Sequence, residues 1–286
     1  MEKAKRVVWR LLAASVHADS LDEQRNRYAQ IKQAWDNKQM DTVQALMPTL
    51  KDYPLYPYLE YRQITDDLMN QPTVTVNNFI QANPTLPPAR TLKSRFVNEL
   101  ARREDWRGLL AFSPDKPGAT EAQCNYYYAK WATGQQEEAW TGAKELWLTG
   151  KSQPNACDPL FSAWRASGKQ DPLSYLERIR LAMKAGNTRL VTVLAGQMPA
   201  DYQTIASAVI SLANDPNTVL TFARSTGATD FTRQMAAVAF ASVARDDVEN
   251  ARLMIPQLVQ AQQLNDDQTQ ELRDIVAWRL MGTDVT

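Results

Sequence analysis

The chain of 286 residues is poor in the side chains on which most catalytic and metal sites depend. It has one histidine, His17, near its start, so a Ser-His-Asp or Cys-His site is excluded from the body of the chain. No His and Cys cluster provides the ligands of a zinc site, and none of the ten glycines forms a phosphate-binding loop. The sequence therefore predicts no catalytic residue, no metal site and no cofactor.

Net charge and long apolar runs are missing as well. The 32 Lys and Arg balance the 32 Asp and Glu, which argues against nucleic acid or an anionic membrane as the main partner. No apolar run approaches the roughly 18 residues of a membrane span, so we expect no integral membrane segment. The apolar fraction of 44% is ordinary for a packed globular protein.

Two sets of charged residues could in principle carry function. The adjacent carboxylates Glu137-Glu138 and Asp246-Asp247 would point about 100° apart on a helix, so we interpret them as solvated surface and not as catalytic pairs. A basic run could face a polyanion, but acidic residues interrupt it, and a solvated face is the favoured interpretation. The run comprises Arg90, Lys93, Arg95, Arg102, Arg103 and Arg107.

Apolar residues recur at the 3.6-residue spacing of helices, with frequent stops between them. Fifteen prolines in such a composition favour many short helices over a few long ones. No segment alternates convincingly at period two, so we expect essentially no sheet. The sequence thus predicts an all-α fold, an irregular α-superhelix or solenoid of short antiparallel helix hairpins.

The clearest hairpin occupies residues 120–164. Helical spacing from Cys124 to Ala132 is followed by Gly134, which takes the left-handed conformation of a helix end at little cost. A second apolar face then ends at Trp147. Two helices joined this tightly must lie antiparallel, each covering the apolar face of the other.

The aromatic side chains of this hairpin could stack on sugar rings. At helical spacing, however, they more often belong to a core, and that is the interpretation we favour. We expect Tyr126 to be the one that points outward. The set comprises Tyr126, Tyr127, Tyr128, Trp131, Trp140 and Trp147.

The two cysteines, Cys124 and Cys157, lie at opposite ends of the hairpin segment. In an oxidising compartment they would form one disulfide, worth roughly 4 kcal/mol on the chain-entropy model. The alternative is a pair of buried thiols that behave as small apolar side chains. The residues themselves leave both readings open.

The N-terminus has the form of a shortened secretory signal. Lys3, Lys5, Arg6 and Arg10 precede a short apolar segment and the small residues near Ala18. We expect residues 1–18 to be a degenerate signal-peptide-like leader.

We expect residues 19–286 to form the helical array. The polar segment 282–286 supplies no capping helix. We therefore expect the array to be incomplete at its C-terminal end.

Three strings carry a resemblance to a known family. They are KDYPLYPYLEYRQI at 51–64, FVNELARREDWRGLLAF at 96–112 and AQCNYYYAKWATG at 122–134. They closely resemble the soluble lytic murein transglycosylase family of Gram-negative bacteria, and the similarity covers residues 19–286.

The resemblance implies a U-shaped superhelical domain, which in the family precedes a linker region and a lysozyme-like catalytic domain. The family is periplasmic and cleaves the bond between N-acetylmuramic acid and N-acetylglucosamine in peptidoglycan. It is a lyase that leaves a 1,6-anhydro sugar, with one Glu acting as acid and then as base. The family's two cysteines match Cys124 and Cys157, so the resemblance implies a disulfide between them.

The family's catalytic motifs, a Glu-Ser pair and the stretches Gly-Leu-Met-Gln and Ala-Tyr-Asn-Ala-Gly, do not occur in this sequence. No catalytic or substrate-binding residue is assigned for that reason. The leading hypothesis is the N-terminal scaffold portion of a lytic transglycosylase, inactive alone. The alternatives are a helical module that binds peptidoglycan strands or a partner cell-wall enzyme, and a truncated gene product without function.

Overall fold

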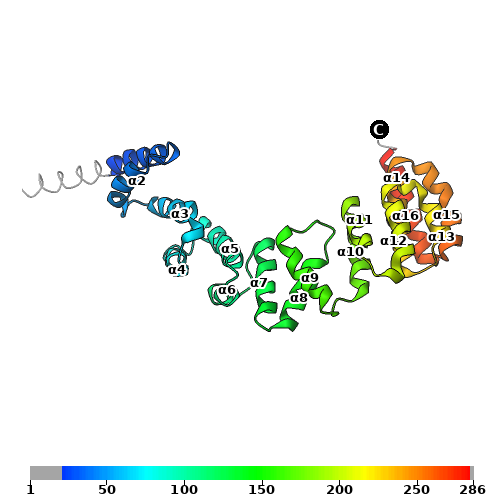
Figure 1. Ribbon diagram of the computed structural model, residues 1–286. Coiled ribbons are helices and arrows are strands. Elements are labelled where there is room, and N and C mark those ends of the chain that lie inside the picture. Colours follow the sequence, from blue (N-terminus) through cyan, green and yellow to red (C-terminus); the bar gives the residue numbers. More distant parts are fainter. Residues whose placement is uncertain (1–20, 284–286) are drawn as a thin grey trace, which may run out of the picture. The chain divides into compact units, whose positions relative to one another are not determined.

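The computed structural model describes residues 21–283, so the predicted leader lies outside the described residues (Figure 1). The described residues form helices joined by turns, without a strand, and the predicted all-α class is confirmed for them. The chain divides into two compact units at Pro114/Asp115. Within residues 21–283 no helix combines the length and the apolar character needed to cross a bilayer.

The first unit is built from short helices whose ends follow its prolines. Pro48 lies in the first turn of η1, where its missing N–H is tolerated, and α2 ends just before it. Prolines also occupy the first turns of α3 and α5. The elements are residues 21–36, α2 (Met40–Leu46), η1 (Met47–Leu50), α3 (Tyr56–Asp66), η2 (Leu68–Asn70), α4 (Thr73–Ala82), α5 (Pro87–Arg102) and α6 (Trp106–Phe112).

One member of the predicted basic run holds this unit together. The Arg103 guanidinium donates to the carbonyls of Leu68, Met69 and Gln71 at 2.9–3.1 Å, and so satisfies the exposed end of η2. It also lies over the Phe96 ring, 5.2 Å from the centroid. Arg103 is therefore a structural tie between α5 and η2.

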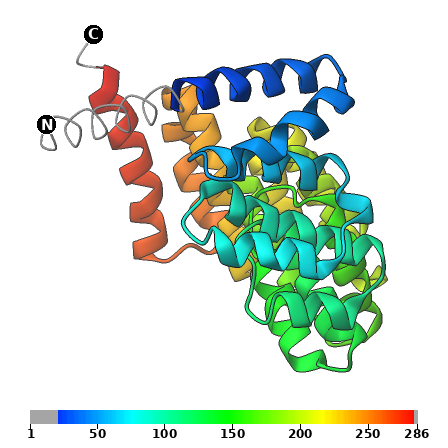
Figure 2. The same ribbon diagram turned by 90° about the vertical axis from the view of Figure 1, so that its left-hand side faces the viewer.

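The second unit begins with a helical hairpin, and its three longest helices, α14, α15 and α16, come at its end. Its elements are α7 (Thr120–Ala132), α8 (Gln136–Trp147), η3 (Asn155–Cys157), α9 (Asp158–Ala166), α10 (Pro172–Lys184), α11 (Thr188–Gly196), η4 (Ala200–Tyr202), α12 (Gln203–Asn214), η5 (Pro216–Thr218), α13 (Val219–Ser225), α14 (Asp230–Asp246), α15 (Val248–Gln262) and α16 (Asp266–Thr283). Consecutive helices pack on one another, as the views in Figures 1 and 2 show for α14, α15 and α16. One continuous buried cluster runs from α7 to α16.

The predicted hairpin is present as α7 and α8. Gly134 ends α7 with a φ of 89°, a backbone conformation that other residues adopt only with strain. Gly142 in α8 is buried against the Tyr127 ring of α7, so the absence of a side chain lets the two helices approach closely.

The helix α14 contacts both α10 and α16 in the second unit. Met235 and Ala239 of α14 are buried, whereas Val238 and Ser242 are only partly buried. Phe240 and Val243 of the same helix are buried and belong to the continuous core.

Gly142→Ala should lower the free energy of unfolding by about 1–3 kcal/mol, because its Cβ would collide with the Tyr127 ring. Gly196→Ala is the matched control, since Gly196 ends α11 with open space around its Cα. It should leave stability unchanged or raise it by up to about 1 kcal/mol. Urea denaturation of both variants measures the difference, and equal stabilities would contradict the close approach.

Candidate functional site

The indole of Trp147, at the end of α8, lies at the centre of a cluster of aromatic rings in the second unit. It is 2% exposed and donates from Nε1 to the Ser174 carbonyl at 2.9 Å. Three other rings meet it edge to face, with centroids 5.0–6.1 Å away; they belong to Phe161, Trp164 and Tyr175. Such tilted contacts match the ring quadrupoles. Trp147 therefore ties α8 to α9 and α10.

A buried arginine completes this cluster. The Arg178 guanidinium lies 4.5 Å from the Trp147 ring centroid, and the residue is 4% exposed. Burial lowers the pKa of Arg178 to about 10, and the Asp158 carboxylate opposes that shift. The group is still charged at neutral pH, without an ion pair among the described residues. No sequence pattern singled out this residue.

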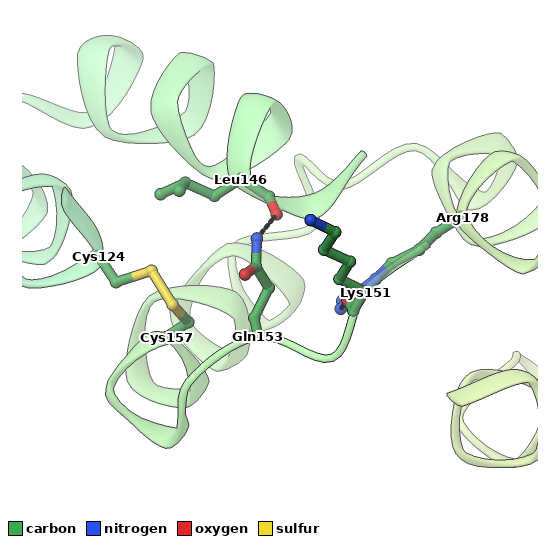
Figure 3. Close-up of a disulfide and its surroundings, with 6 residues drawn as sticks. All are labelled: Cys124, Leu146, Lys151, Gln153, Cys157 and Arg178. Atoms are coloured by element: carbon green, nitrogen blue, oxygen red, sulfur yellow. Dashed lines mark hydrogen bonds between the residues drawn. A yellow bond between two sulfur atoms is a disulfide. The ribbon is translucent and has the colours of Figure 1, made fainter. Parts of the chain in front are cut away.

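Arg178 and the disulfide both act on the loop that follows α8 (Figure 3). Arg178 Nη2 donates to the Lys151 carbonyl at 3.2 Å, and the Gln153 side chain donates back to the Leu146 carbonyl. Cys124 of α7 and Cys157 of η3 form the disulfide at the end of the loop, with Cα atoms 4.9 Å apart. The structure thus contains the disulfide that the resemblance implies.

The residue that caps α11, Asn187, holds the other side of this loop. The Asn187 side chain donates to the Gly150 carbonyl and to the Ser152 hydroxyl, both at 3.2 Å. Gly150 itself packs directly on the backbone of Leu181 in α10. Because a side chain at Gly150 would strike that backbone, the loop is seated against α10 as closely as a glycine permits.

The aromatic set of the hairpin forms a core more than a platform, as expected. Trp147 is buried, and the remaining members are buried or partly buried. The expectation for Tyr126 was wrong: it is 7% exposed and packs edge to face on Tyr127. The ammonium group of Lys130 lies 5.4 Å from its ring centroid. The Tyr126 ring is therefore buried by its contact with the Tyr127 ring and by the Lys130 side chain that lies over it.

The carboxylates that sequence reasoning considered do not converge in the structure. Glu138 pairs with Lys130 at 2.8 Å, and Asp247 caps α15 by accepting from the Asn250 N–H. Burial raises the pKa of Glu60 in α3, the direction that a general acid needs. No cluster of potential metal ligands occurs among residues 21–283. That the chain lacks catalytic residues stays a prediction.

A groove of about 730 Å³ lies over α14, between α10 and α16. Its floor is made of small side chains of α14, namely Ala236, Ala237, Ala241 and Ser242. Volumes of this order are typical of ligand sites. Sequence reasoning missed this groove, because its three helices are separated by up to about a hundred residues of chain and only packing brings them together.

Reducing the disulfide should lower the free energy of unfolding by about 4 kcal/mol, because the open chain regains the entropy of a loop of 33 residues. Urea denaturation with and without dithiothreitol measures the loss. The double variant Cys124→Ala, Cys157→Ala is the control and should ignore the reductant. Coincident curves for the oxidised and reduced protein would contradict the prediction.

Arg178→Met should change the free energy of unfolding by less than about 1 kcal/mol, because methionine keeps the packing on Trp147 and removes an unpaired buried charge. Arg178→Ala should cost about 2–3 kcal/mol through the lost packing. Amide exchange of residues 148–153 should quicken in both variants, because the Lys151 carbonyl loses its donor. Equal losses of stability in the two variants would show that the charge, and not the packing, matters.

The sequence of this chain is similar to those of known proteins. The chain is 85% identical to the soluble lytic murein transglycosylase of Escherichia coli strain K12, over 100% of this chain and 46% of that protein. It is 81% identical to the Salmonella typhimurium strain LT2 protein of the same name, again over 46% of that protein. No protein-family model matches the chain. The chain thus spans about half the length of these curated relatives.

Solved structures agree with the sequence comparison. The 70 kDa soluble lytic transglycosylase of Escherichia coli matches with a TM-score of 0.89 and 88% identity, over 93% of this chain and 43% of that one. The lytic transglycosylase Slt of Pseudomonas aeruginosa matches with a TM-score of 0.76 and 29% identity, over 89% and 41%. This partial coverage is consistent with the scaffold portion that the sequence predicts. Along its whole length, then, this chain is a relative of the soluble lytic murein transglycosylases.

Proposed function

We propose that this chain is the scaffold portion of a peptidoglycan lytic transglycosylase and does not cleave the glycan by itself. The single observation that carries the proposal is the 85% identity over the whole chain, which covers only 46% of the related protein. The described carboxylates support it, since none of the pairs considered converges on a shared cleft. The scaffold would position other parts of such an enzyme against murein.

The periplasm is the compartment that we propose for this chain. Murein lies outside the inner membrane, and the names of the relatives connect them with murein. The disulfide between Cys124 and Cys157 supports the same compartment, because disulfides persist in the oxidising periplasm and are rare in the cytosol.

A binding module is the second candidate, favoured by the groove over α14. A scaffold that also holds murein would raise the local concentration of substrate near a catalytic part. The two candidates are compatible, because neither needs chemistry from this chain.

Purified protein incubated with murein sacculi should release no 1,6-anhydro-muropeptides, because the catalytic motifs of the family do not occur in this sequence. Mass spectrometry of the soluble fraction measures this, with the Escherichia coli enzyme as the positive control. Anhydro products above a heat-treated blank would overturn the proposal that the chain is inert alone.

Association with murein is measured separately by sedimenting sacculi with the protein. We expect retention above that of a globular protein of similar mass and charge. Failure to co-sediment would remove the binding candidate and leave the scaffold proposal in place.

A further inference from the structure

The charged groups around the groove over α14 are unequal in number. Five basic and three acidic side chains line it. Three of the basic ones, Arg180 and Lys184 of α10 and Arg279 of α16, have no ion-pair partner among the described residues. They come from the two opposite walls of the groove. An uncommitted cation on each wall favours a ligand with more than one negative charge.

The other two basic side chains of the groove, Arg233 and Arg245, already make contacts within the chain. Arg233 donates to the Gln262 carbonyl at 2.8 Å and lies 3.4 Å from Asp230, so it belongs to the wall. Arg245 reaches only the neighbouring Asp246, at 3.9 Å, and both side chains are well exposed. An exposed pair of this kind contributes little and is easily exchanged for a ligand. Arg245 is therefore also available.

The uncharged residues that line the groove indicate which groups a ligand would carry between its charges. Gln234 presents an amide group that can pair with a peptide backbone, and Val238 and Ile275 present small apolar surfaces. The alanines of α14 add methyl groups to this apolar surface. None of the described residues that line the groove is aromatic, so it offers no ring on which a sugar could stack. The lining thus favours a peptide over a glycan strand.

The length of the groove agrees with this choice. It follows α14 from Asp230 to Arg245, about 22 Å at the rise of an α-helix. An extended peptide of five residues is about 17 Å long. A peptide of this length therefore fits within the groove along α14.

We propose that this groove binds the peptide stems of peptidoglycan through their carboxylates. The inference rests on the proposed function, because it takes its substrate class from it. In murein the carboxyl group of muramic acid is consumed in the amide bond to the stem. The free carboxylates therefore lie on the peptide, at its glutamate, its diaminopimelate and its terminal alanine, with alanine methyl groups beside them. That pattern of charges and methyl groups complements the groove, whereas the uncharged sugar backbone does not.

The test uses the synthetic pentapeptide L-Ala-γ-D-Glu-meso-diaminopimelate-D-Ala-D-Ala, titrated into the protein and followed by NMR. The double variant Lys184→Glu, Arg279→Glu should bind it at least about tenfold more weakly, because two attractive charges become repulsive. The control is Arg189→Glu, Arg273→Glu, the same change of charge at exposed positions of α11 and α16 outside the groove. The control should bind within about twofold of the parent protein.

Several results would overturn the inference. One is a parent protein that does not bind the peptide; another is an equal loss of affinity in both double variants, which would mean that only net charge matters. Sedimentation with sacculi separates this inference from the proposed function. Equal retention of the parent protein and the groove variant on sacculi would refute the groove as a stem site, while murein binding itself would stand. Weaker retention of the groove variant, with the control variant retained like the parent, would support the inference.

Discussion

The second unit depends on the burial of one indole ring. Trp147 ends α8, and its ring fills the space where α8, α9 and α10 meet, with three aromatic neighbours around it. Its N–H is satisfied by the Ser174 carbonyl, so the ring is buried without an orphaned donor. A smaller side chain would leave a cavity at a junction of three helices, where no single helix can move to fill it.

The loop after α8 is held both by this packing and by a covalent cross-link. Its backbone carbonyls have no helix or sheet to pair with, and side chains of Arg178 and Asn187 supply the donors instead. Burying Arg178 costs free energy, which its lowered pKa records. The Trp147 ring and the loop carbonyl offset that cost. The disulfide then fixes the far end of the same loop to α7.

The second unit contains two regions with different roles, the cluster around Trp147 and the groove over α14. The region around Trp147 is buried and cross-linked, and its polar groups serve the fold. The groove over α14 is open, and several of its charged groups serve no contact within the described chain. Uncommitted charge beside a rigid core is the arrangement in which a binding surface loses little entropy when it meets a ligand. In the scaffold that we propose, the groove would hold substrate without taking part in its cleavage.

The sequence by itself determined the helices and their ends, because both follow from local rules. Apolar spacing, prolines in first turns and Gly134 after α7 each act within a few residues. The identity of the family also came from the sequence, since long specific strings carried it. Only the tertiary structure decided that Tyr126 faces inward and that Arg178 lies over Trp147. Those outcomes depend on which distant helix covers each face, and local periodicity contains no information about that partner.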